Sequence, residues 1–273
     1  MPSLAMSPQL FVLFTALVEE ASGIAYSIDD SELFASKVAD HAIELGYGSL
    51  LDYYYRLRYD DPDGYEIRRL IEALLVHETY FFRELAPLTE LVDGYLATVV
   101  EQRGRARVWS AACATGEEPY TLAMLLDERG LLDKVEIVAT DISGSALARA
   151  ESGRHSRRSL RDGYPPALAA RYLEVSSHGV LVAPRIRGAV TFQRLNLIDA
   201  AAIASLGQFD AILCRNVLIY FKESRVLAVV DRLTAALRPG GWLAVGVSES
   251  LLRFGTSLIC EERGGSFFYR RAQ

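Results

Sequence analysis

The chain has 273 residues, 51% of them hydrophobic and 23% charged, so it can bury a full core and has the composition of a globular protein. Its formal net charge is −6, which argues against nucleic-acid binding, because nucleic-acid-binding proteins usually present a basic face. Three widely spaced cysteines exclude a disulfide framework and a zinc site with closely spaced ligands, and we expect no metal.

The first apolar run, Leu10 to Val18, has the length of a signal-peptide core. A secretory signal begins with basic residues, but the first basic residue here is Lys37, and Glu19 and Glu20 follow the run directly. We therefore expect a buried or amphipathic first helix. No later run is apolar for long enough to span a bilayer, so we expect a cytoplasmic protein that is not inserted in a membrane.

Residues 1–90 are predicted to form an N-terminal all-helical domain. Apolar residues recur at helical spacing after Ser31 and within 49–58 and 65–77. The Asp- and Pro-containing stretch 60–64 is typical of a turn between the last two helices.

Residues 91–273 are predicted to form an α/β domain, because short apolar strands alternate with helices. This alternation indicates a mainly parallel sheet covered on both faces. The expected strands are 107–110, 135–140, 209–214 and 242–247, and the expected helices are 117–128, 143–151 and 224–237. The segments 258–262 and 266–270 flank two glycines and predict a final hairpin, so that the last strand runs antiparallel.

The alternation is interrupted at about 160–192, a stretch rich in proline and glycine. Its β-like runs, 179–183 and 189–192, predict a small antiparallel β subdomain inserted in the α/β domain. Residues 238–241, Arg-Pro-Gly-Gly, predict a turn that ends the preceding helix.

The first strand-to-helix crossover, residues 111–119, holds small residues that allow close approach to the backbone. It lacks the G-x-G-x-x-G pattern that places a pyrophosphate at a helix N-terminus, which excludes a nicotinamide oxidoreductase. Glu117 and Glu118 would repel a phosphate but attract an ammonium group, such as that of S-adenosylmethionine. The alternative is a capped helix start, since Thr115 and Glu118 match a capping box.

Two further segments place polar groups where an α/β sheet binds ligands, at the carboxyl ends of its strands, and a third lies at the end of the helical part. Asp141 ends the second strand, where a carboxylate holds ribose hydroxyls, and Ile142 could cover an adenine; the alternative is a turn or helix cap. Arg215 and Asn216 end a later strand, and ordinary packing is the alternative there. Arg83 follows three aromatic residues and suits bidentate contact with a carboxylate.

Seven motifs in chain order together resemble the CheR-type chemotaxis receptor methyltransferases. They are Thr79-Tyr-Phe-Phe-Arg-Glu84, Trp109-Ser-Ala-Ala-Cys-Ala-Thr-Gly-Glu-Glu-Pro-Tyr120, Ala139-Thr-Asp-Ile142, Arg194-Leu-Asn-Leu197, Cys214-Arg-Asn-Val-Leu-Ile-Tyr-Phe221, Leu237-Arg-Pro-Gly-Gly241 and Ser248-Glu-Ser-Leu251. The resemblance covers residues 65–270. It implies a class I S-adenosylmethionine-dependent methyltransferase fold, Rossmann-like, with an N-terminal helical domain and a β insertion.

The resemblance also implies an activity: transfer of a methyl group from S-adenosylmethionine to glutamate carboxylates of a chemoreceptor, which leaves S-adenosylhomocysteine and glutamate methyl esters. It implies chemotaxis signalling and a partner that is the cytoplasmic part of a chemoreceptor or similar protein. Arg83 and Tyr220 match positions that handle the substrate. The positions matching the cofactor pocket are His77, Thr79, Arg83, Glu117, Asp141, Asn196, Leu197, Arg215 and Asn216.

The chain departs from the family pattern in three places. His77 stands where the family usually has Asn. The segment 36–41 is nearly neutral or acidic, where the family often carries arginines that dock on the receptor. The insertion around 176–180 is shorter than in members that bind a receptor's C-terminal pentapeptide tether. We therefore expect tether-independent action or a substrate other than a standard chemoreceptor.

Two alternatives keep the same cofactor motifs. A non-catalytic sensor or adaptor would bind S-adenosylmethionine or S-adenosylhomocysteine without turnover, but retention of Arg83 and Tyr220 favours an enzyme. A nucleic-acid methyltransferase would need basic surface; four arginines at 154–161 are the one candidate, and a solvated helix end or a protein-docking patch explains them better. We expect a monomer, because no association motif is evident.

Overall fold

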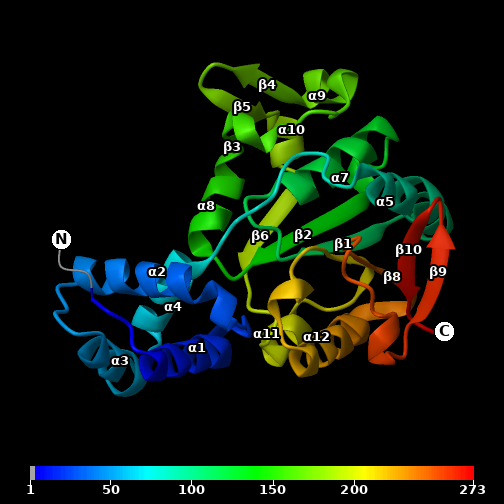
Figure 1. Ribbon diagram of the computed structural model, residues 1–273. Coiled ribbons are helices and arrows are strands. Elements are labelled where there is room, and N and C mark those ends of the chain that lie inside the picture. The colour runs from blue at the N-terminus through cyan, green and yellow to red at the C-terminus, as the bar shows by residue number, and fades with distance from the viewer. Residues whose placement is uncertain (1–3) are drawn as a thin grey trace. The chain divides into compact units, whose positions relative to one another are not determined.

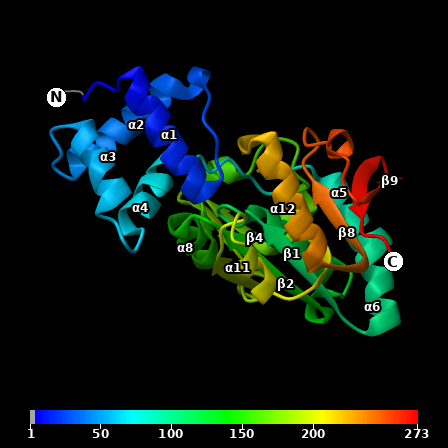
Figure 2. The same ribbon diagram turned by 90° about the horizontal axis from the view of Figure 1, so that it is seen from below.

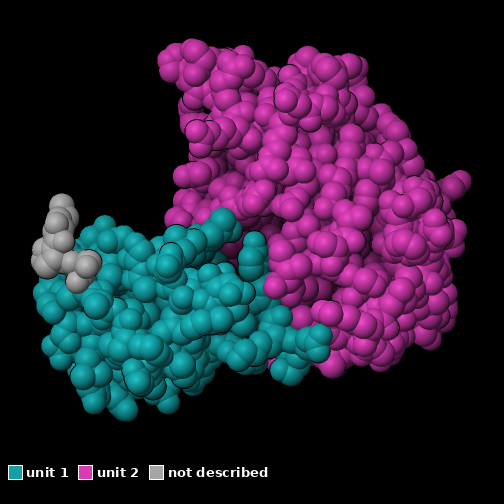
Figure 3. All heavy atoms as spheres, in the orientation of Figure 1, with its two compact units in different colours: residues 1–76, 220–225 teal, residues 77–219, 226–273 magenta. Residues whose placement is uncertain are grey.

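In the computed structural model, which describes residues 4–273, the chain divides into two compact units (Figure 3). The first comprises residues up to Val76 together with Tyr220–Arg225, and the second comprises His77–Ile219 and Val226–Gln273. The sequence placed residues 77–90 with the helical domain. The structure groups them with the second unit, because Phe81, Phe82 and Leu88 are buried in that unit's apolar core.

The first unit is helical, and its helices begin and end at residues that favour those positions (Figure 1). Pro8 opens the first helix after Ser7, whose hydroxyl accepts a hydrogen bond from the amide of Leu10, and Gly23 ends it with φ 82°. Its elements are α1 (Pro8–Ser22), η1 (Ile28–Asp30), α2 (Ser31–Glu44), α3 (Leu50–Tyr59) and α4 (Tyr65–Leu74). The expected first helix and the three that follow it are confirmed.

The second unit is built on a seven-stranded sheet in the order β6-β2-β1-β7-β8-β10-β9. The strands are β1 (Ala106–Ala111), β2 (Val135–Asp141), β6 (Val190–Arg194), β7 (Phe209–Cys214), β8 (Leu237–Val245), β9 (Ile259–Arg263) and β10 (Ser266–Arg270). All pairs from β6 to β8 are parallel, whereas β10 pairs antiparallel with both β8 and β9. The predicted class I fold with an antiparallel C-terminal hairpin is therefore confirmed.

Helices lie on both faces of this sheet (Figures 1 and 2). They are α5 (Leu85–Glu90), the π-helical turn η2 (Leu91–Leu96), α6 (Ala97–Arg103), α7 (Glu117–Glu128), α8 (Gly144–Ser152), α11 (Ala200–Ser205) and α12 (Glu223–Ala236). The short helical turns are η3 (Leu132–Lys134), η4 (Arg157–Ser159), η5 (Leu218–Tyr220) and η6 (Leu252–Phe254). Because helices cover both faces, β7 is buried at every position and β1 at every position but one.

A second, three-stranded antiparallel sheet is inserted between β2 and β6. It consists of β3 (Arg154–His155), β5 (Gly179–Val182) and β4 (Leu173–Ser176) in that order, with α9 (Pro166–Tyr172) and α10 (Pro184–Arg187). The run 189–192 was expected in this insertion, but β6 pairs in parallel with β2 in the main sheet. Sequence alternation marks a strand but does not specify its distant partner.

The helix before residues 238–241 ends at Ala236, as predicted, but these residues lie within β8 rather than before it. Leu237 already pairs with Phe209, and the register shifts before Trp242 pairs with Ala211, so these residues form an irregularity within β8. Gly241 has no room for a side chain, because a Cβ there would lie 2.9 Å from the carbonyl oxygen of Asp210. In residues 4–273, no helix combines the length and the apolar character needed to cross a membrane.

Candidate functional site

The carboxyl ends of three strands hold predicted site residues at one edge of the sheet. Asp141 ends β2, the loop 112–116 follows β1, and Arg215 with Asn216 follows β7. Because β1 pairs with both β2 and β7, these strand ends lie within about 10 Å of one another. This edge is where open α/β sheets bind their ligands.

The end of β6 brings Asn196 and Leu197 to the same edge. The amide of Leu195 donates to the carbonyl of Asp141 at 2.9 Å, which continues the β2–β6 pairing past the end of the strands. The amide of Ile198 then donates to the Asn196 Oδ1 at 3.2 Å, and this bond holds the Asn196 side chain in a turn. Leu197 is buried, whereas Asn196 is half-buried.

Strained backbone concentrates in the segments that carry the predicted site. Five non-glycine residues among those described have positive φ: Phe82, Glu84, Ala112, Ala114 and Asn216. For a residue with a side chain, the left-handed conformation is about 1–2 kcal/mol less stable than the right-handed one. It therefore persists only where the surrounding structure imposes it. Such clustering is typical of functional segments.

The loop after β1 is tied to the end of β2. The amide of Ala114 donates to the Asp141 Oδ2 at 2.8 Å, and the amide of Ser143 donates to its Oδ1 at 2.9 Å. Gly116 follows with φ 92°, and a Cβ there would lie 2.8 Å from the Cβ of Ala150. These two amides therefore fix the position of the Asp141 carboxylate. It lies beside the backbone of the loop after β1, whose side chains are small.

Arg215 is buried between two carboxylates of other segments. Its Nη1 donates to the Glu118 Oε2 at 2.9 Å, and its Nη2 donates to the Glu84 Oε2 at 2.8 Å and to the carbonyl of Arg83 at 3.0 Å. Burial lowers the pKa of the Arg215 guanidinium, but Glu118 and Glu84 outweigh burial and raise the pKa above its ordinary value. Arg215 therefore carries a permanent positive charge that joins the 77–84 segment to α7.

Glu118 does not cap α7, contrary to the predicted capping box. Its carboxylate accepts hydrogen bonds from Arg215 and from the Ser110 hydroxyl, the latter at 2.7 Å. Thr115 donates instead to the Glu117 Oε2, and the helix begins at Glu117, after Gly116, without a side-chain cap. The sequence pattern was correct in placing the helix start but wrong about these contacts.

Glu117 is buried and its carboxylate contacts three side chains. Its Oε2 accepts from Thr115 at 2.7 Å, and its Oε1 lies 2.9 Å from the Ser159 hydroxyl and 3.0 Å from the His155 Nδ1. Burial raises the pKa of the Glu117 carboxyl, but the bonds from His155 and Thr115 outweigh it and leave the pKa below its ordinary value. Glu117 is therefore an anion that also fastens the inserted segment to α7.

The loops after β7 and β8 are joined by a carboxylate that sequence reasoning missed. Glu249 is buried; its Oε2 accepts from the amides of Asn216 at 2.5 Å and Gly246 at 2.8 Å, and its Oε1 accepts from the amide of Ile219 at 3.2 Å. Gly246 has no room for a Cβ, which would lie 2.7 Å from the Glu249 Oε2. Glu249 thus fixes the backbone of Asn216 in its left-handed conformation.

The segment 77–84 carries Arg83 and His77. Arg83 donates from Nη1 to the carbonyl of Glu78 at 2.8 Å, and its guanidinium lies over the Tyr80 ring at 5.6 Å. Among the described residues, the buried Nε2 of His77 has no hydrogen-bond partner. Thr79, which stands between them in the chain, is half-buried.

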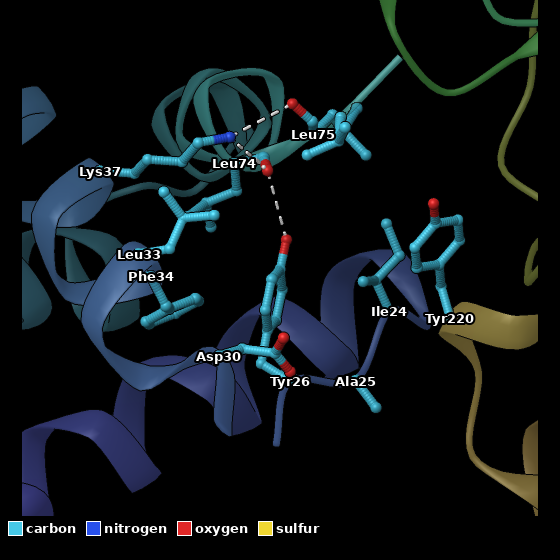
Figure 4. A pocket seen from close by; sticks show the side chains of 11 residues that line it. Ile24, Ala25, Tyr26, Asp30, Leu33, Phe34, Lys37, Leu74, Leu75 and Tyr220 are labelled. Atoms are coloured by element: carbon cyan, nitrogen blue, oxygen red, sulfur yellow. Dashed lines mark hydrogen bonds between the residues drawn. The ribbon is translucent and has the colours of Figure 1, made fainter. Parts of the chain in front are cut away.

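Tyr220 belongs to the first unit, where it lines a pocket of about 160 Å³ (Figure 4). Its carbonyl accepts a hydrogen bond from the amide of Ala25 at 2.8 Å, and Phe221 forms an antiparallel bridge with Ile24. The structure thus brings the strand-end residues together and joins them to the Arg83 backbone through Arg215, whereas Tyr220 is fixed against the α1–α2 connection.

The comparisons with known proteins agree with this geometry. The family model described as "CheR methyltransferase, SAM binding domain" matches residues 77–262. The chain belongs to this family. It is 36% identical to "Chemotaxis protein methyltransferase 1" of Pseudomonas aeruginosa, over 88% of this chain and 90% of the relative. It is 34% identical to "Chemotaxis protein methyltransferase" of Vibrio parahaemolyticus, over 92% of each chain.

A third relative has a different pathway in its name. The chain is 35% identical to "Probable biofilm formation methyltransferase WspC" of Pseudomonas aeruginosa, over 72% of this chain and 47% of the relative. Membership of the family confirms the predicted S-adenosylmethionine-dependent methyltransferase activity, with S-adenosylmethionine as the methyl donor.

The residues at the strand ends fit this cofactor. A cationic amino acid moiety suits a site whose buried side chains include Asp141 and Glu117, and the Nε2 of His77 is a buried polar atom that requires a partner. Sequence reasoning missed Glu84 and Glu249, although both stand in motifs that it quoted. A glutamate within a motif does not reveal its partners, which are the side chains of Arg215 and Asn216 for Glu84 and backbone amides for Glu249.

Proposed function

We propose that this protein methylates glutamate side-chain carboxylates of a chemoreceptor-like signalling protein, and that it acts in the cytoplasm without a peptide tether. The main support is the Arg83–Glu84–Arg215–Asn216 arrangement, in which strained backbone and a buried ion pair hold the predicted substrate-handling arginine beside predicted cofactor residues. We propose that S-adenosylmethionine is bound by the residues that the sequence motifs matched to the cofactor pocket.

The reaction makes modest demands on the protein. When bound, S-adenosylmethionine supplies a methyl group on a sulfonium, and a glutamate carboxylate is anionic at neutral pH, so no general base is needed. We assign Arg83 to holding the substrate carboxylate and Tyr220 to orienting it. The positive sulfonium and the negative carboxylate neutralise each other as the methyl group transfers. Alignment of these two groups and exclusion of water therefore provide most of the rate enhancement.

The deciding experiment uses S-adenosylmethionine labelled in its methyl group and membranes that hold the native receptors. Label that alkali releases as methanol would identify a methyl ester and support the proposed function. Binding of S-adenosylhomocysteine without any methyl transfer would contradict it and favour the alternative, a non-catalytic sensor or adaptor.

Arg83 has a matched control in Arg161. Both guanidinium groups lie over the Tyr80 ring, Arg161 at 4.1 Å, and Arg161 also pairs with Glu78 at 3.0 Å. We expect Arg83→Ala to lower kcat at least about 100-fold and Arg161→Ala to change it less than about threefold. Equal effects of the two substitutions would remove Arg83 from the mechanism.

Tether independence is supported by the tight hairpin of the insertion. Ser176 pairs with Gly179 at the end of β4 and β5, so only Ser177 and His178 form the turn. Gly179 has φ 139°, and a Cβ there would lie 2.3 Å from the carbonyl of His155. We expect no heat of binding when a receptor's C-terminal pentapeptide is titrated into the protein, and measurable affinity would refute this part of the proposal.

A further inference from the structure

The pocket in the helical unit has apolar walls and polar groups that the protein itself already satisfies (Figure 4). The Lys37 Nζ donates to the carbonyls of Leu74 at 3.0 Å and Leu75 at 3.4 Å, and the Tyr26 hydroxyl donates to the carbonyl of Leu74 at 3.5 Å. These bonds cap the end of α4. An occupant therefore meets few unsatisfied donors, and the space favours an apolar group.

The volume limits the occupant to one side chain. A cavity of about 150 Å³ lined by apolar residues holds a molecule the size of benzene, and this pocket measures about 160 Å³. The aromatic ring of Phe34 forms part of its wall. Burial raises the pKa of Tyr26 to about 12, with Asp30 and Tyr220 adding to the effect, so the Tyr26 hydroxyl stays neutral at physiological pH.

The rim exposes large apolar surface. Leu33 is 60% exposed, Val76 is 60% exposed and Tyr220 is 41% exposed. Figure 4 shows Tyr220 and Ile24 on the side of the pocket away from Leu33 and Lys37. Covering such side chains is favourable, so the rim would contribute to binding whatever enters the pocket.

The chain links this pocket to the predicted chemistry at two points. Val76 directly precedes His77, and Tyr220 follows Asn216 by four residues, a stretch of at most about 14 Å. Tyr220 is also the residue assigned above to orient the incoming carboxylate. A protein that presents a glutamate to Tyr220 therefore brings the neighbouring side chains to this rim.

We propose that this pocket receives an apolar side chain, of the size of Leu, Met or Phe, that flanks the methylated glutamate in the substrate protein. The pocket then selects among glutamates by their neighbours, because only those with an apolar side chain at the matching position fill it. This proposal rests on the proposed function.

The test substitutes a rim residue that the fold does not need. Leu33→Asp places a carboxylate at the mouth of the pocket, where an entering apolar side chain would have to desolvate it. Val12→Asp is the matched control, because Val12 is a 63% exposed apolar residue of α1 outside the pocket. Methyl transfer is measured with labelled S-adenosylmethionine at varied concentrations of membranes holding the native receptors.

We expect Leu33→Asp to raise the KM for the membranes about tenfold, while the Kd for S-adenosylhomocysteine and the helical circular dichroism stay those of the parent. Val12→Asp should leave all three unchanged. Transfer that Leu33→Asp leaves unaltered would overturn the pocket proposal and leave the proposed function standing. Absence of transfer by the parent chain would refute the proposed function and this proposal with it.

Discussion

At the scale of single residues, the site depends on buried carboxylates that hold backbone amides rather than ligands. Glu249 is the clearest case, because its two oxygens accept from Asn216, Ile219 and Gly246. In Glu249→Gln, an amide NH₂ would face one or two of these N–H donors. We expect the KM for S-adenosylmethionine to rise about tenfold, since the loop that carries Arg215 and Asn216 would lose its fixed position.

The control for Glu249 is Glu261→Gln. The Glu261 carboxylate pairs with Arg263 and Arg270 in the C-terminal hairpin, so the same Glu→Gln change there removes a bonded carboxylate away from the site. Urea unfolding of both variants separates stability from positioning. If both raised the KM equally, or if Glu249→Gln lowered only stability, Glu249 would have no positioning role.

Glu117 gives a pH dependence whose sign follows from its environment. Its folded-state pKa is below the ordinary value, so its contribution to stability is present above about pH 4.3 and is lost as the pH falls through the folded-state pKa. Glu117→Gln should therefore cost about 2 kcal/mol at pH 7, and the difference from the parent should shrink toward pH 3.

Urea denaturation at several pH values between 3 and 7 measures this difference. Glu101→Gln serves as the control, because Glu101 is an exposed carboxylate at the end of α6. A difference between Glu117→Gln and the parent that stays constant down to pH 3 would show that the carboxylate contributes no charge-dependent stability.

At the scale of elements, the entry to α7 depends on Gly116. With φ 92° and a Cβ position 2.8 Å from the Ala150 Cβ, Gly116→Ala must both strain the backbone and move α8. Gly104 is a matched control: its φ is 77° at the end of α6, and a Cβ there would have no atom within 4 Å. Gly104→Ala tests the strain alone.

We expect Gly104→Ala to lower the free energy of unfolding by about 1 kcal/mol and Gly116→Ala by about 3 kcal/mol. Only Gly116→Ala should also weaken S-adenosylhomocysteine binding, because it displaces the loop held by Asp141. Thermal unfolding and calorimetric titration measure the two quantities. Equal losses in both variants would show that the contact with Ala150 is relieved without cost.

The sequence predicted elements better than it predicted their partners. The strands around 107–110, 135–140 and 209–214 were found because short, mainly apolar segments alternate with helical ones along the chain. The strand 189–192 was assigned to the wrong sheet, since its pairing with β2 spans some fifty residues and leaves no local trace. Motif order likewise located the site, whereas the contacts of Glu84 and Glu249 arise only when distant loops meet.

At the scale of the whole molecule, charge predicts how the protein meets its substrate. The net charge is −6, and α2 exposes Glu32, Ser36, Asp40 and Glu44 at intervals of four residues, which place them along one stripe. The one lysine of α2, Lys37, is directed to the carbonyls of Leu74 and Leu75. This face of α2 is therefore not attracted electrostatically to an acidic partner or to anionic lipid.

We expect the KM for receptor-containing membranes to stay level or to fall when the salt concentration rises from about 50 to 200 mM, because screening weakens repulsion between like charges. Recruitment by a basic face would instead raise the KM severalfold over that range. Steady-state methylation at three salt concentrations distinguishes the two cases, with the Kd for S-adenosylhomocysteine as a reference for salt effects on the cofactor site. A steep rise in KM alone would place basic residues outside α2 at the contact, and the four arginines at 154–161 would be the first to substitute.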